Sequence, residues 1–244
     1  MTMLWEESGW ESLGPRAGRV RLPVWDCTAG LVVGDRGALM IDPGSSLREG
    51  DRLRAEAGRL LAPLGGERCV THLAFTHPHF DHVLGAAVFE GAEAFGAAGI
   101  GALFERERDE LCADAVRHGV APGEAAEAVG ALARPRHEVA GERTLDLGGV
   151  EVLLANMGPG HTAHDLVVLV PGDPGVVFCG DLVEESGEPQ AGPDAVASLW
   201  PAALDRLLGL GGEDARYVPG HGAVVDAGFV RSQRDALAAR FGVS

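Results

Sequence analysis

The sequence contains no lysine, and all 20 of its basic residues are arginines. The acidic residues number 36, so the formal net charge at pH 7 is −16. A chain this acidic repels polyphosphate backbones, which argues against DNA or RNA as the main partner. Simple solubility explains the charge without any partner. No cluster of arginines marks a phosphate pocket, so we expect a small-molecule substrate and no nucleic acid.

Cysteine is scarce, with four widely spaced residues and no Cys-x-x-Cys pair. This excludes a thiolate zinc knuckle and a thioredoxin-type site. The opening "MTMLWEESGW" lacks the basic and apolar regions of a signal peptide, and no apolar run is long enough to cross a bilayer. The sequence therefore predicts reduced thiols in a cytoplasmic protein with no membrane contact, and it leaves the oligomeric state open.

Short strands alternate with helical segments along the chain. The turn "GDRG" joins "LVV" to "ALMID" as a hairpin. In "SLREGDRLRAEAGRLL", Leu53, Ala57 and Leu60 share one helical face, and Ser45 or Ser46 can cap the helix. We expect helices packed outside sheets, an α/β architecture.

No linker and no repeat of solenoid length interrupts residues 1–244, so we expect a single domain. Its two halves, divided near residue 148, each read as strands followed by a helix. A charged, alanine-rich helical insert occupies residues near 101–133. This insert forms either a lid over a site or a solvated outer layer.

Histidine is concentrated in "THPHFDH", residues 76–82, which holds three of the nine histidines. An extended backbone that turns into a helix at Phe80 would aim the polar side chains of this heptapeptide at two neighbouring points. Three further candidates follow predicted strands in the glycine-rich stretches "GPGHTAH", "FCGD" and "VPGHG". The seven candidate ligands are His77, His79, Asp81, His82, His161, Asp181 and His221.

Imidazole and carboxylate donors without thiolate suit zinc, iron or manganese. The first predicted site takes its nitrogens from His77, His79 and His161, and the second takes its donors from Asp81, His82 and His221. Asp181 has two oxygens and can bridge them. Two divalent ions, zinc first with iron or manganese as alternatives, would then share a hydroxide as the nucleophile at a spacing of roughly 3.5–4 Å.

The order His-x-His-x-Asp-His, Gly-His, Gly-Asp, Gly-His resembles the signature of the metallo-β-lactamase-fold hydrolases over roughly residues 20–240. The resemblance implies an αββα four-layer sandwich with metals at one edge, and hydrolysis as the commonest activity. It also implies that Asp42 in "LMIDPG" supports the metal loop, whereas a turn-forming aspartate is the alternative. The largest subclass of true β-lactamases carries Cys where this chain has Asp181, which favours the glyoxalase-II, lactonase and phosphodiesterase members.

We therefore expect a dinuclear metal-dependent hydrolase of a small ester, thioester or lactone that acts through a metal-bound hydroxide. The alternatives are a mononuclear iron enzyme of the persulfide-dioxygenase type, a β-lactamase-like amide hydrolase, and a binding module without catalysis. Asp81 is both a ligand and a candidate proton acceptor. His164 is either a proton donor to the leaving group or a solvent-facing loop histidine.

Two neighbours of these residues carry open expectations. Asp165 either orients His161 or caps the next strand. Cys179 is the nearest thiol, and strand alternation places it on the same side as Asp181. No Gly-x-Ser-x-Gly elbow offers another nucleophile.

Overall fold

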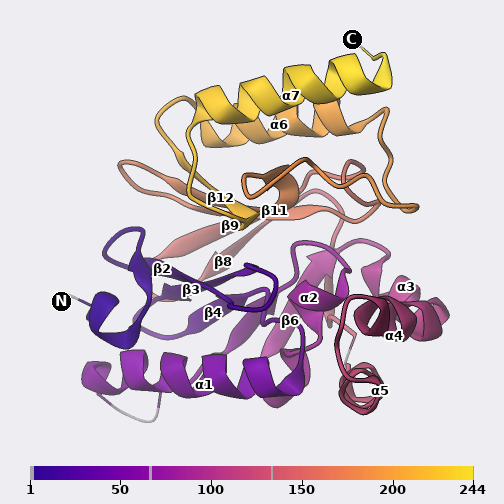
Figure 1. Cartoon of the computed structure of the whole chain (residues 1–244). Helices are drawn as coiled ribbons and strands as arrows, with labels where there is room; N and C mark the ends of the chain where they lie inside the picture. The colour runs from indigo at the N-terminus through magenta and orange to yellow at the C-terminus, as the bar shows by residue number, and fades with distance from the viewer. Residues whose placement is uncertain (1–2, 66–67, 133, 244) are drawn as a thin grey trace.

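The computed structural model describes residues 3–65, 68–132 and 134–243. Two β-sheets lie face to face, and helices cover the outer face of each sheet (Figure 1). This four-layer αββα arrangement confirms the predicted α/β fold class.

The first sheet has seven strands in sequence order. Its first four strands pair antiparallel and the rest pair parallel. Gly34 N donates to Gly37 O at 2.9 Å, which closes the predicted hairpin between β3 and β4. The strands are β1 (Glu11–Ser12), β2 (Ala17–Arg21), β3 (Thr28–Val33), β4 (Ala38–Ile41), β5 (His72–Ala74), β6 (Glu93–Ala97) and β7 (His137–Val139).

The second sheet has five strands in the order β12-β11-β10-β9-β8. The strands are β8 (Glu142–Asp146), β9 (Glu151–Asn156), β10 (Leu166–Val170), β11 (Val176–Glu184) and β12 (Arg216–His221). This sheet begins earlier than the predicted division near residue 148. Leu145 is the one buried residue of β8, so the strand lacks the apolar alternation that would have marked it.

Three long helices form the outer layers. α1 (Leu47–Leu61) covers the first sheet, and α6 (Trp200–Gly211) and α7 (Ala227–Phe241) cover the second (Figure 1). Ser46 caps α1 by accepting a hydrogen bond from Glu49 N, as one of the two predicted alternatives. The apolar face of α1 is buried as the sequence predicts, because Leu53, Ala57 and Leu60 all face the sheet.

Four shorter helices lie at one end of the sandwich (Figure 1). α2 (Phe80–Val83) follows β5, and the segment predicted as an insert forms α3 (Ile100–Arg106), α4 (Arg108–Arg117) and α5 (Pro122–Ala131). The 3₁₀ turns are η1 (Glu6–Ser8), η2 (Ala62–Leu64) and η3 (Ala86–Val88). α4 packs against α2, since His118 at its end stacks on Phe80 with ring centroids 5.5 Å apart.

Three apolar cores hold the layers together. One lies between the first sheet and its helices, a second lies between the two sheets, and a third lies between the second sheet and α6 and α7. The central core interdigitates side chains such as Phe95 of β6 and Phe178 of β11. None of the helices that the structure describes is long and apolar enough to cross a membrane.

Candidate metal centre

The heptapeptide follows β5 at one end of the first sheet. His79 keeps an extended backbone (φ −74°, ψ 150°), and α2 begins at Phe80, which confirms the predicted turn into a helix. His77 and His79 therefore come from extended chain, and Asp81 and His82 come from the first turn of α2. This change of conformation directs four polar side chains inward from seven consecutive residues.

The other three candidates arrive from the second sheet. His161 lies in the loop after β9, Asp181 lies within β11, and His221 ends β12. β11 carries a register shift at Gly180, whose φ is +53°. A Cβ atom at Gly180 would lie 2.5 Å from Thr76 Oγ1, so glycine is what permits β11 to pass this close to the heptapeptide.

Asp181 stands at the middle of the cluster. Its Oδ2 lies 3.6 Å from His77 Nε2, 3.6 Å from His161 Nε2 and 3.4 Å from His221 Nε2. Its Oδ1 lies 3.2 Å from His82 Nε2. One carboxylate thus reaches histidines of both predicted sites.

Two donor groups share Asp181. The first consists of His77, His79, His161 and Asp181, and the second consists of His82, Asp181 and His221. Asp81 joins the second group, since its Oδ2 lies 3.3 Å from His221 Nε2 and 3.6 Å from His82 Nε2. The structure therefore brings all seven predicted residues together.

Cys27 is a neighbour that the sequence did not reveal. Its Sγ lies 3.6 Å from His82 Nδ1 and 3.3 Å from the carbonyl oxygen of Asp81. Burial raises the pKa of this thiol to about 11, against the lowering effect of His82. Cys27 is therefore a neutral thiol at the back of the second group. Its position depends on a bridge to His221, far away in the sequence.

The buried Asp42 orients two histidines: it contacts the outer nitrogen of His82 directly and that of His77 through Thr76. Asp42 Oδ2 accepts from His82 Nδ1 at 2.9 Å and from the Thr76 hydroxyl at 2.6 Å. Because that hydroxyl gives its hydrogen to Asp42, it accepts one from His77 Nδ1 at 2.9 Å. Asp42 has a φ of +50°, a backbone conformation that non-glycine residues rarely adopt, and it supports the loop as the resemblance implied.

The outer nitrogens of the remaining histidines also face acceptors. His79 Nε2 lies 2.9 Å from Asp194 Oδ2. His161 Nδ1 lies 3.2 Å from the carbonyl oxygen of Gln190, and His221 Nδ1 lies 2.8 Å from that of Trp25. None of these three partners was predicted.

The outer contacts determine which nitrogen of each ring carries its hydrogen. Every outer partner accepts, so each of the five rings donates outward and, in the neutral form that metal binding requires, presents a lone pair to the interior. His79 Nδ1 and His161 Nε2 then face each other at 3.1 Å without a hydrogen between them. His77 Nε2 and Asp181 Oδ1 are buried and have no hydrogen-bond partner among the described residues. Converging lone pairs and an orphaned carboxylate oxygen fit divalent cations.

The pKa shifts within the cluster also favour a bound cation. Burial lowers the pKa of His161 to about 4, with a further contribution from His79. Burial alone would raise the pKa of Asp181, but His82, His77 and His221 outweigh it and hold that pKa well below its usual value. Asp181 in turn raises the pKa of His221 to about 12 against the effect of burial. The cluster therefore holds an ionised carboxylate at its centre, which a divalent cation would neutralise in place of the inner proton of His221.

His164 and Asp165 lie in the same loop as His161. His164 is half-buried, and its Nδ1 lies 2.9 Å from the carbonyl oxygen of Ala98. Its role as a proton donor stays a prediction. Asp165 accepts hydrogen bonds from Thr162 N at 3.0 Å and from the Thr162 hydroxyl at 2.6 Å. Asp165 thus closes the turn that carries His161, and burial raises its pKa to about 7.

The placement expected for Cys179 was wrong. Its side chain belongs to the core between the second sheet and α6, together with Trp200. Its Sγ donates to the carbonyl oxygen of Val177 at 3.2 Å, and burial raises the pKa of this thiol. The register shift at Gly180 breaks the alternation of β11, so Cys179 and Asp181 face different layers.

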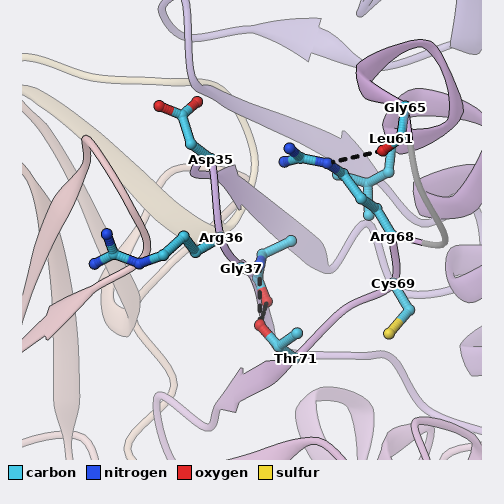
Figure 2. A pocket seen from close by; sticks show the side chains of 9 residues that line it. Asp35, Arg36, Gly37, Leu61, Gly65, Arg68, Cys69 and Thr71 are labelled. Carbon is cyan, nitrogen blue, oxygen red and sulfur yellow. Dashed lines mark hydrogen bonds between the residues drawn. The ribbon is translucent and has the colours of Figure 1, made fainter.

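A cavity of about 300 Å³ lies elsewhere on the chain (Figure 2). Arg68 donates to the carbonyl oxygen of Gly65, and Arg36 is paired with Asp146. Both guanidinium groups are therefore already occupied, and none of the seven candidate ligands lines this cavity. Its lining is Asp35, Arg36, Gly37, Ala38, Leu61, Gly65, Arg68, Cys69 and Thr71.

Comparisons with known proteins agree with this geometry. A family model described as the metallo-beta-lactamase superfamily matches residues 22–221. No curated protein matches the chain. Among solved structures, the metallo-beta-lactamase from Pontibacter korlensis is 20% identical with a TM-score of 0.73, over 93% of this chain and 97% of that one.

Two further solved structures share the fold. DIM-1 metallo-beta-lactamase is 16% identical with a TM-score of 0.70, over 95% of this chain and 97% of its own. The metallo-beta-lactamase FIM-1 from Pseudomonas aeruginosa, in its mono-zinc form, is 17% identical with a TM-score of 0.69, over 96% of each chain. At these identities the likeness concerns the fold alone.

Proposed function

We propose a dinuclear centre and a small carbonyl substrate for this chain, which belongs to the metallo-beta-lactamase superfamily and is a metal-dependent hydrolase. The substrate is a small ester, thioester or lactone. The two ions are divalent, with zinc as the first expectation and iron or manganese as alternatives. The four free cysteines fit a reducing compartment, so we assign the protein to the cytoplasm.

The position of Asp181 carries the proposal of two ions. Its two oxygens lie within 3.6 Å of histidines from both donor groups, and Oδ1 has no hydrogen-bond partner among the described residues. A single ion would use one group and leave the lone pairs of the other group facing a buried carboxylate. His77, His79 and His161 would hold one ion, His82, His221 and Asp81 would hold the other, and Asp181 would bridge them.

The ions supply Lewis acidity and an acidified water when bound. The chain supplies position and proton transfer. Asp81 is buried and ionised, since burial opposes but His82 and His221 outweigh it in lowering its pKa. We assign Asp81 as proton acceptor as well as ligand. His164 Nδ1 donates its hydrogen bond to the carbonyl oxygen of Ala98, so Nε2 is the nitrogen that would first take up a proton and then pass it to a leaving group.

The nature of the bridging residue supports esters, thioesters and lactones over β-lactams. Asp181 stands where the largest subclass of true β-lactamases carries a cysteine, and Cys179 is committed to the core beside α6. Amide hydrolysis of a β-lactam remains the second candidate, because the solved structures of this fold reported above are β-lactamases.

Metal analysis and a substrate panel test the proposal together. Protein purified without added metal or chelator is assayed for zinc, iron and manganese, and is then offered esters, thioesters, lactones and a β-lactam. We expect two ions per chain and turnover of a carbonyl substrate outside the β-lactams. One iron per chain with oxygen uptake would support the dioxygenase alternative, and β-lactam turnover alone would support the second candidate.

A further inference from the structure

One connecting segment holds two of the three histidines of the first donor group from outside. Residues 185–199 join β11 to α6, and we call them the β11–α6 segment. Its Gln190 carbonyl oxygen accepts from His161 Nδ1, and its Asp194 carboxylate accepts from His79 Nε2. The first ion would therefore be held by rings whose orientation depends on a loop.

His79 is the ligand with the weakest support from the core. Its side chain is 27% exposed, whereas the side chains of His77 and His161 are 1% and 3% exposed. Among the described residues, its Nε2 contacts Asp194 on the outer side, and its Nδ1 faces His161 on the inner side. Asp194 alone therefore determines the tautomer of His79 from outside.

The consequence of this tautomer reaches the ligand nitrogen. An ionised Asp194 requires the hydrogen on His79 Nε2, so Nδ1 keeps its lone pair toward the first group. The distance of 2.9 Å between Asp194 Oδ2 and His79 Nε2 is that of a hydrogen bond. A histidine that donates to a carboxylate is also a more basic ligand.

The β11–α6 segment is itself fastened at several points. Glu185 N donates to the carbonyl oxygen of His221 at 3.2 Å, and the carbonyl oxygen of Pro189 accepts from Arg240 at 2.9 Å. Val196 N donates to the carbonyl oxygen of Gly160 at 3.0 Å, next to His161. These hydrogen bonds lie on both sides of Asp194 in the sequence, so they fix the position of its backbone and direct its carboxylate toward His79.

We propose that Asp194 is a positioning residue that orients His79 and thereby sets the affinity of the first metal site, while the second site is independent of it. This inference rests on the proposed function only in requiring metal ions in the centre. It does not depend on which substrate is hydrolysed.

Three variants separate the hydrogen bond from the charge. Asp194→Ala removes both, and Asp194→Asn removes the charge but keeps an oxygen that can accept from His79. Glu188→Gln removes one negative charge from the same segment, and no hydrogen bond or ion pair of the described residues joins the Glu188 side chain to a candidate ligand. Zinc affinity of each ion is measured on the full chain by competition with a chelator, and unfolding of the chelator-treated proteins is followed alongside.

We expect Asp194→Ala to weaken one of the two ions by roughly 10–100-fold, Asp194→Asn to weaken it less, and Glu188→Gln to match the wild type. The metal-free variants should unfold at the same temperature as the metal-free wild type. Equal zinc affinity in Asp194→Ala and the wild type, or an equal loss in Glu188→Gln, would overturn the inference. A lower unfolding temperature of metal-free Asp194→Ala would also overturn it, since it would mark a merely structural contact.

The same measurements keep this inference apart from the proposed function. A wild type that binds two ions yet hydrolyses nothing on the panel contradicts the function, while the affinities still decide the role of Asp194. A wild type that hydrolyses esters, with unchanged affinity in Asp194→Ala, contradicts the inference alone. A wild type that takes up no metal overturns both.

Discussion

Gly220 offers a way to disable the centre without touching any of its seven donors. It precedes His221 at the end of β12 and runs beside Asp181. A Cβ atom here would fall inside the contact distance of Asp181 Oδ1 and 2.9 Å from the carbonyl carbon of Gly180. The φ of Gly220 is not positive, so alanine can adopt its backbone and the conflict is one of contact alone.

The size of the conflict sets the expected loss. Non-bonded heavy atoms sit at about 3.5 Å, so the carboxylate oxygen must retreat by more than about 1 Å. A displacement of about 1 Å in a catalytic arrangement costs roughly 100-fold in rate, which corresponds to about 2.7 kcal/mol in barrier. Because Asp181 serves both donor groups, we expect Gly220→Ala to lose at least one ion and at least about 100-fold in kcat/KM.

The assay needs a glycine control and a folding control. Gly187→Ala makes the same substitution where no atom lies within 4 Å of the new Cβ, and it should keep both ions. Metal content is measured by mass spectrometry, and circular dichroism checks that Gly220→Ala is folded. A folded Gly220→Ala protein with two ions and the wild-type rate would refute the placement of Asp181 at the centre.

Four further predictions follow from the same geometry. Asp181→Ala should lose at least one ion and most turnover while its circular dichroism is retained, and full metal content would remove Asp181 from the site. Asp42→Ala should leave His82 and Thr76 without their acceptor and lower both metal affinity, by roughly 10–100-fold, and the unfolding temperature; an unchanged affinity on titration with zinc would contradict this. Because Cys179 is packed in the core, Cys179→Ala should keep both ions and at least about a tenth of the rate. An acyl adduct on this thiol in mass spectra would exclude a metal-bound hydroxide as the nucleophile. The metal-free protein should lose stability in urea as the pH rises above 6.5, because His221 has a raised pKa of about 12 and its contribution is lost as the pH rises from 6.5 toward that value; a flat profile from pH 6.5 to 8.5 would contradict this.

The alternation of strands and helices could be predicted wherever burial follows a regular period. The face of α1 and the β3–β4 hairpin obey that rule, since the helix buries every third or fourth residue and a glycine-rich turn joins two buried strands. β8 does not obey it. Its residues other than Leu145 are exposed and are either charged or, at Thr144, polar, so pairing with β9 rather than burial makes it a strand.

The seven donors could be predicted because their signal is local. Four lie within one heptapeptide, and the other three lie beside or within one residue of glycine, although Asp181 is inside β11 rather than after it as predicted. Cys179 shows where local reasoning fails. Alternation holds only in a regular strand, and the shift at Gly180 exists because β11 must pass Thr76 at close range. That requirement comes from the packing of the two sheets, so the residues "VVFCGD" alone do not predict the register shift.

The outer partners of the histidines also fall into two kinds, those that a sequence pattern could indicate and those that it could not. Asp42 has a recognisable place, at the end of an apolar strand ahead of Pro43 and Gly44, so its supporting role could be anticipated. Gln190 and Trp25 act through backbone carbonyl oxygens, which every residue type possesses, so no sequence pattern can select them. Asp194 is one of 36 acidic residues and becomes distinct only when the β11–α6 segment brings it within 2.9 Å of His79. The ligand residues can thus be predicted from the sequence, but tertiary contacts determine the tautomers that direct their lone pairs inward.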